Sequence, residues 1–152
     1  MKLPGGTLYF DANATTPEER AVTEAVSHAA RHAFANPSSP HGPGRVARTA
    51  LDQARAEVAD LCGCRSAEVV FCGSATEANF LALRSAVRGA PGRKRVLASG
   101  IEHPSVLSAL DDLKAEGWKV QLLPVTRAGQ LDLSALEEAL GPDVAAVSLI
   151  AA

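Results

Sequence analysis

The sequence predicts an α/β fold in which helices flank an open, largely parallel sheet. From residue 68 onward, short apolar runs alternate with segments of helical periodicity. Strands separated by helices of this length form right-handed βαβ units. In addition, residues 120–125 and 144–150 are almost continuously apolar, which is typical of strands buried on both faces.

The first part of the chain predicts two helices joined by an irregular loop. Residues 8–10 form a short apolar strand or arm, and Thr16, Pro17 and Glu19 then fit the N-cap, N1 and N3 positions of a helix that runs to about His32. The loop spans residues 36–44 and contains three prolines. The second helix covers residues 45–61, with an apolar stripe of Val46, Ala50, Leu51, Ala54, Val58 and Leu61.

The alternation of strands and helices becomes regular after residue 68. Gly117 fits the position that closes a helix, and Arg127, Ala128 and Gly129 form a turn. We expect strands at residues 68–71, 95–99, 119–123 and 144–150, and helices at residues 76–87, 104–116 and 134–140.

The sequence predicts one domain over residues 1–152, because no linker, repeat or low-complexity segment marks a second one. The chain stops on what reads as a central strand, without a terminal helix or polar tail. We therefore expect this chain to be a fragment.

Composition excludes several classes of protein. A net charge of −2 and a pI near 6.1 argue against a nucleic-acid-binding surface, and we expect the basic residues 93–95 merely to solvate a loop. No apolar run approaches the ~20 residues of a membrane span, and the N-terminus lacks the apolar core of a signal peptide. These features predict a cytoplasmic location without a membrane partner.

Three cysteines, Cys62, Cys64 and Cys72, give an odd count with no disulfide framework. Cys62 and Cys64 could supply two soft metal ligands, but too few further ligands are available, so we expect no metal site. Gly63 instead suits the residue that closes a helix ending at Cys62.

A candidate anion site follows the apolar run at residues 69–71. Ser74 and Glu77 have the Ser-x-x-Glu spacing of a helix capping box. A helix that begins here presents backbone N–H groups and a partial positive charge, which together bind a phosphate. The competing interpretation is that these small and polar residues only start a helix.

A second candidate site follows the next predicted strand, at Glu102 and His103. His103 precedes Pro104, which fits the first position of a helix. A neutral imidazole at this place could stack on a flat ring and exchange protons near neutral pH. Alternatively, the histidine only caps its helix.

Four motifs in this order resemble those of cysteine desulfurases, which are pyridoxal-phosphate (PLP) enzymes of the class V aminotransferase group. The resemblance extends from about residue 8 to the last residue. The motifs are Asp11-x-Asn13-Ala14-Thr15-Thr16, Asn36-Pro37-Ser38-Ser39-x-His41-x-x-Gly44, Ala75-Thr76-Glu77-x-Asn79 and Glu102-His103-x-x-Val106.

The resemblance implies the large domain of a fold-type I PLP enzyme. It implies that Ala75 and Thr76 bind the PLP phosphate, and that His103 stacks on the PLP ring and shuttles protons as the catalytic residue. Residues 13–15 and 36–41 match loops that border the active site. It also implies L-cysteine as substrate, L-alanine and an enzyme persulfide as products, a homodimer, and a sulfur-acceptor or scaffold protein in iron–sulfur cluster assembly.

The chain also departs from the family pattern. It has Gly73-Ser74 where the family usually has Ser-Gly, and Cys72 where Thr is common. The family's Schiff-base lysine, the aspartate that pairs with the pyridine nitrogen and the persulfide-carrying cysteine have no match here, so we expect the 152 residues alone to be inactive. The alternatives are another class V enzyme, such as a selenocysteine lyase or aminotransferase, and a short non-catalytic paralogue.

Overall fold

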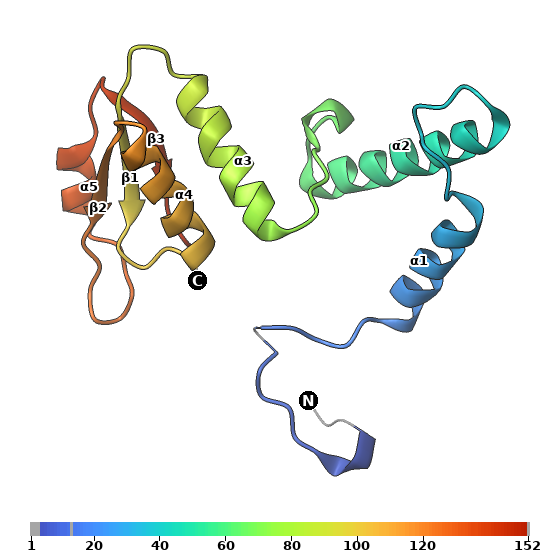
Figure 1. Cartoon of the computed structure of the whole chain (residues 1–152). Helices are drawn as coiled ribbons and strands as arrows, with labels where there is room; N and C mark the ends of the chain where they lie inside the picture. Colours follow the sequence, from blue (N-terminus) through green and yellow to red (C-terminus); the bar gives the residue numbers. More distant parts are fainter. Residues whose placement is uncertain (1–3, 13, 152) are drawn as a thin grey trace. The chain divides into compact units, whose positions relative to one another are not determined.

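The computed structural model describes residues 4–12 and 14–151, which form two compact units (Figure 1). The first unit comprises residues 1–70 and the second comprises residues 71–152. That they belong to one domain stays a prediction.

The first unit is helical. It contains a 3₁₀ turn η1 (Pro4–Gly6), helices α1 (Arg20–His32) and α2 (Gly42–Cys62), and a second 3₁₀ turn η2 (Ser66–Glu68). The segment predicted as an arm holds no extended strand beyond a single bridge at Leu8.

Helix α1 begins later than the sequence predicts. Thr16 is not its N-cap, because the first helical hydrogen bonds run from the N–H groups of Val22 and Thr23 to the carbonyl oxygen of Glu19. Glu19 caps the helix without a side-chain hydrogen bond. Pro17 favours an extended residue before it, so Thr16 to Glu19 lead into the helix rather than open it. The predicted end at His32 is confirmed.

Helix α2 begins three residues before the predicted start. The His41 side chain caps it by accepting a hydrogen bond from Gly44 N at 3.2 Å, and Pro43 lies in its first turn. The predicted end is confirmed, because Gly63 adopts a left-handed conformation with φ of 65° after Cys62. The N–H of Cys64 then reaches back to Ala59 O at 2.9 Å.

The predicted strand at residues 68–71 is wrong. The backbone N–H of Arg65 donates to the Glu68 carboxylate at 2.8 Å, and this interaction caps the start of η2. No strand follows, and Val70 and Phe71 are 73% and 47% exposed. Apolar residues gain a strand's packing energy only when burial accompanies pairing, so apolar content alone misled the prediction here.

The second unit confirms the predicted fold class. Its elements are α3 (Ala75–Arg88), β1 (Arg95–Ser99), α4 (Pro104–Ala115), β2 (Lys119–Leu123), α5 (Leu133–Ala139) and β3 (Val144–Ser148). The strands form a parallel sheet in the order β2-β1-β3, with an irregularity in the β1–β3 register between Arg95 and Val96. The predicted turn at residues 127–129 is present, with Gly129 at φ of 77°.

The central strand β1 separates two apolar clusters. Val96 and Ala98 face α3 and α4, with Leu83, Val87, Val106, Ala109, Leu110 and Leu113 in the same cluster. Leu97 points to the other side, where Leu123, Ala139 and Val144 join it, so α5 covers that face (Figure 1). Burial on both faces is therefore a property of β1 alone among the described strands. The prediction of such burial for residues 120–125 and 144–150 is wrong, because β2 and β3 are the edge strands of this sheet and Leu122 and Val147 are 49% and 41% exposed. The predicted strand at residues 144–150 ends at Ser148.

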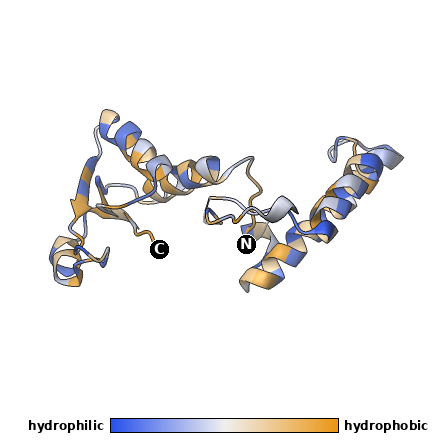
Figure 2. Cartoon of the chain, turned by 90° about the horizontal axis from the view of Figure 1, so that it is seen from below, coloured by the Kyte–Doolittle hydropathy of each residue, from blue (hydrophilic) through white to orange (hydrophobic). Residues whose placement is uncertain are grey.

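Polar and apolar residues mix along the helices (Figure 2). Within residues 4–12 and 14–151, every helix is too short or too polar to cross a membrane.

The basic residues 93–95 join the amino ends of the strands, which corrects the prediction that they only solvate a loop. Arg95 forms an ion pair with Asp143 at 2.9 Å and donates to Gln121 at 2.9 Å, and Arg93 donates to Val144 O at 2.9 Å. The Lys94 ammonium lies 5.0 Å from the centre of the Trp118 ring.

The Arg95 side chain holds the pKa of Asp143 below its ordinary value, chiefly through its hydrogen bonds. A lowered folded-state pKa contributes stability above the unfolded pKa near 3.8, and this contribution is lost as the pH falls through the folded pKa. We expect Asp143→Asn to flatten the pH dependence of the urea midpoint below about pH 4. The exposed Glu138→Gln serves as control, and equal acid sensitivity of the two variants would count against this role of the pair.

Candidate functional site

The carboxyl ends of β1 and β3 lie beside each other in the sheet. Ser99 ends β1 and Ser148 ends β3, and a short loop then leads from Ser99 to the start of α4 at Pro104. In open α/β sheets, ligands bind beyond this edge. Both sequence-predicted candidate sites belong to this unit.

The start of α3 forms the predicted cap. Ser74 accepts a hydrogen bond from Glu77 N at 3.2 Å, and the Glu77 carboxylate accepts from Gly73 N at 2.6 Å, one residue earlier than in a standard capping box. Within the described part of the chain, the backbone N–H groups of Ala75 and Thr76 have no acceptor. Both residues are exposed, so these two donors are available to an anion.

His103 lies at the N-cap of α4 and is exposed. Its Nδ1 accepts a hydrogen bond from Ser105 N at 3.1 Å and lies 2.8 Å from Ser105 Oγ. The ring therefore does cap its helix, as one of the two interpretations predicts. Nε2 has no partner among residues 4–12 and 14–151, which leaves that nitrogen and the ring to a ligand.

A side-chain contact joins the two halves of the site. Asn79, just over one turn into α3, donates from Nδ2 to Ser105 Oγ at 2.9 Å. The N-terminal turns of α3 and α4 are thereby held together, and Ala75, Thr76 and His103 belong to these turns or adjoin them.

Glu102 is buried, with 6% of its surface exposed, and the sequence analysis assigned it no role of its own. Its carboxyl group accepts hydrogen bonds from Ser99 Oγ at 2.5 Å, Ser148 Oγ at 3.0 Å and Ile150 N at 2.7 Å. Glu102, the residue before His103, therefore joins the ends of β1 and β3. The sequence feature that could have pointed to Glu102 was the position of an acidic residue between an apolar strand and a helix that begins with proline.

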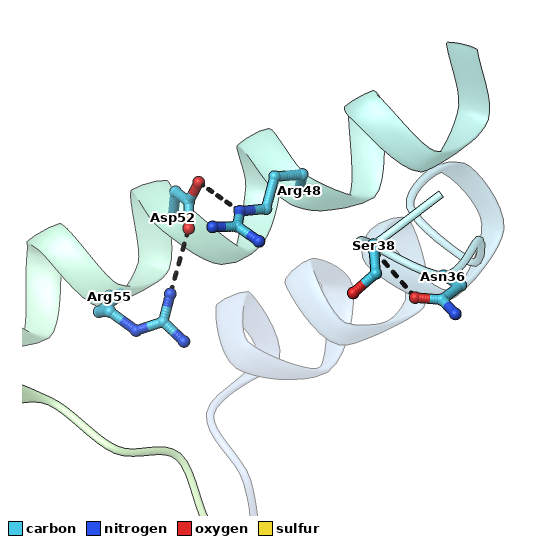
Figure 3. Close-up of polar contacts among 5 residues, drawn as sticks. All are labelled: Asn36, Ser38, Arg48, Asp52 and Arg55. Atoms are coloured by element: carbon cyan, nitrogen blue, oxygen red, sulfur yellow. Dashed lines mark hydrogen bonds and ion pairs between the residues drawn. The ribbon is translucent and has the colours of Figure 1, made fainter. Parts of the chain in front are cut away.

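The loop at residues 36–44 lies in the first unit and is tightly folded. Asn36 Oδ1 accepts from Ser38 N at 2.9 Å, and on the neighbouring helix Asp52 pairs with Arg48 and Arg55 (Figure 3). Of the other predicted border loop, Asn13 is outside the described residues, and Thr15 O accepts from the Tyr9 hydroxyl at 2.9 Å.

The residues at the starts of α3 and α4 fit a phosphate and a flat ring, which PLP combines. Two backbone donors, the Thr76 hydroxyl and small neighbouring side chains suit the phosphate, and the exposed imidazole suits the ring. A lysine for covalent attachment is not at this edge among the described residues. Lys94 and Lys119 lie at the amino ends of β1 and β2, and Lys114 lies in the last turn of α4, where it pairs with Asp111.

The described cysteines do not lie in a cluster of metal-ligating side chains. Cys62 and Cys64 are exposed in the first unit, and Cys72 is half-buried in the second. In residues 4–12 and 14–151, no three side chains of His, Cys, Asp or Glu form a group that could hold a metal ion.

Comparison with known proteins agrees with this arrangement. The cysteine desulfurase of Frankia sp. (strain EuIK1) is 42% identical over 154 residues, and the alignment covers 95% of this chain and 37% of that protein. A solved structure described as a NifS-like protein matches with a TM-score of 0.89 at 33% identity, covering 95% of this chain and 40% of that one. A structure described as SspA in complex with cysteine matches with a TM-score of 0.85 at 33% identity, covering 94% and 42%.

The chain spans a little over a third of the length of the curated relative, so the comparison concerns that region only. The profile of the class-V aminotransferases matches residues 8–152. The similarity in sequence, in fold and in family profile covers nearly the whole chain. The chain therefore belongs to the class-V aminotransferase family.

Proposed function

We propose that these residues form the phosphate- and ring-binding part of the PLP site of a cysteine-desulfurase-like enzyme. The proposed reaction converts L-cysteine to L-alanine and leaves the sulfur on an enzyme cysteine as a persulfide. The observation that carries this proposal is the pair of unsatisfied N–H groups at Ala75 and Thr76 on the turn that Asn79 ties to the His103 turn. The cysteine desulfurase relative supports the choice of reaction.

Each residue has a defined task in this proposal. The N–H groups of Ala75 and Thr76 and the Thr76 hydroxyl bind the phosphate, and the partial positive charge of the α3 N-terminus favours it. The His103 ring stacks on the flat face of the cofactor and holds a proton at Nε2. When bound, PLP supplies the electron sink that the reaction needs.

Other tasks need further groups, since no described lysine lies at this edge and Cys72, just before α3, does not match the family's persulfide-carrying cysteine. A lysine must hold the cofactor and a cysteine must take up the sulfur. We propose that the 152 residues alone are inactive, and that the complete protein is a cytoplasmic homodimer that passes sulfur to an acceptor or scaffold protein for iron–sulfur clusters. The resemblance to a NifS-like protein supports this role.

Titration with PLP tests the site in the complete gene product that contains these residues. We expect Thr76→Ala to weaken PLP binding about tenfold or more, because a hydrogen bond to a charged acceptor is lost. We expect His103→Ala to retain PLP but to change its absorbance and to slow alanine formation from L-cysteine about a hundredfold. Ser85→Ala, at the far end of α3, is the matched control. If neither Thr76→Ala nor His103→Ala differs from this control, the proposed site is wrong.

A further inference from the structure

The hydrogen bonds around His103 determine which ring nitrogen carries the proton. A backbone N–H can only donate, and Ser105 N lies 3.1 Å from His103 Nδ1. Nδ1 must therefore be the acceptor, and the proton of the neutral ring is on Nε2.

The same argument fixes the next two groups. Ser105 Oγ lies 2.8 Å from Nδ1, and since Nδ1 accepts, the hydroxyl uses its single proton to donate there. The Asn79 side chain lies 2.9 Å from the same Oγ, so it has to donate as well, which assigns its nitrogen and not its oxygen to this contact. The bonds thus run in one direction, from Asn79 through Ser105 to His103.

Burial shields these bonds from water. Asn79 and Ser105 are both half-buried between α3 and α4, whereas His103 is exposed. The two inner groups therefore exchange hydrogen bonds with water less readily than the ring that they hold.

We propose that the Asn79 and Ser105 side chains are positioning groups that, together with the backbone N–H of Ser105, hold His103 as its Nε2–H tautomer and fix the plane of its ring. Nε2 then meets the ligand as a hydrogen-bond donor, and it can accept a proton only after the bonds at Nδ1 have been rearranged. The identity of that ligand rests on the proposed function, whereas the tautomer does not.

The tautomer can be measured without any cofactor. In the complete gene product labelled with ¹⁵N-histidine, we expect the NMR spectrum to show a pyridine-type Nδ1 resonance and a pyrrole-type Nε2 resonance for the neutral His103 ring. These resonances are assigned as the ones that disappear in His103→Gln. A pyrrole-type Nδ1 in the unmodified protein would overturn the proposal, whatever any variant does.

Asn79→Asp nearly keeps the shape of the side chain and tests the direction of the hydrogen bonds from Asn79 to His103. The introduced carboxylate accepts the Ser105 proton, so the hydroxyl can no longer donate to Nδ1. In Asn79→Asp, we expect the His103 Nδ1 resonance to move toward the pyrrole type. In Asn79→Ala, we expect the tautomer to stay and only the ring orientation to become less fixed. Ser105→Ala keeps the backbone N–H donor to Nδ1, so its Nδ1 should stay pyridine-type while the ring orientation becomes less fixed. Ser108→Ala, on the exposed face of α4, is the control. An unchanged Nδ1 resonance in folded Asn79→Asp protein would show that the side chains do not direct the tautomer.

Turnover distinguishes this proposal from the proposed function. If both hold, Ser105→Ala and Asn79→Asp lower kcat about three- to tenfold while PLP affinity stays unchanged, as for the loss of one orienting hydrogen bond. An Nε2–H tautomer in a protein that does not bind PLP would reject the function and retain the positioning role.

Discussion

Replacement of Glu102 by alanine is expected to lower the free energy of unfolding by about 3 kcal/mol, because three donors lose their acceptor and at least one of them is buried. The two serine hydroxyls can rotate toward other acceptors, whereas the Ile150 N–H is fixed by the backbone. Urea unfolding of the complete gene product gives the overall loss, and hydrogen exchange at the Ile150 amide reports the local effect.

Glu102→Gln separates the contribution of the side chain's size from that of its hydrogen bonds to the free energy of unfolding. The amide keeps the size of the side chain and one oxygen acceptor, so we expect a smaller loss than for alanine. Glu138→Ala, at an exposed position on α5, should be nearly neutral. If Glu102→Ala unfolds at the same urea concentration as Glu138→Ala, then Glu102 does not hold the strand ends together.

Gly44→Ala is expected to disrupt the loop that precedes α2. A Cβ atom at this position would overlap the carbonyl oxygen of Ser39 and would lie 3.0 Å from Asn36 O. Both contacts are with backbone atoms, which cannot rotate away, so the loop or the first turn of α2 must move. The expected cost is about 1–3 kcal/mol or more, seen as a lower melting temperature.

Gly42→Ala is the matched control, two residues away in the same turn. Nothing lies within 4 Å of a Cβ added there, and alanine favours a helix, so the substitution should be neutral or stabilising. Equal melting temperatures for the two variants would contradict the close approach at Gly44.

The sequence predicted most of the second unit because local and tertiary signals agree there. Ser74, Pro104 and Gly117 mark helix ends by local chemistry, and the structure places those ends within a residue of the prediction. The three predicted strands after residue 94 form because apolar runs coincide with burial against α3, α4 and α5.

The failures have physical causes as well. At residues 68–71 the apolar signal was present, but Glu68 turned the chain into η2. At Thr16 a plausible cap competed with the extended conformation that Pro17 favours in the residue before it. The Glu102 interactions could not be predicted, because two of its donors come from Ser148 and Ile150, far along the sequence, and only the β1–β3 pairing brings them close.

The distance along the chain between Glu102 and its partners has a consequence for synthesis. Ile150 follows Glu102 by 48 residues, so at ribosomal speeds it emerges roughly 2–10 s later. When Glu102 emerges, Ser99 is the only one of its three donors that has already left the ribosome, and Ser148 follows 46 residues later. The nascent chain can pack α4 on β1 early, because these contacts are local. The sheet edge that Glu102 holds together therefore acquires its final form only after Ile150 has left the ribosome.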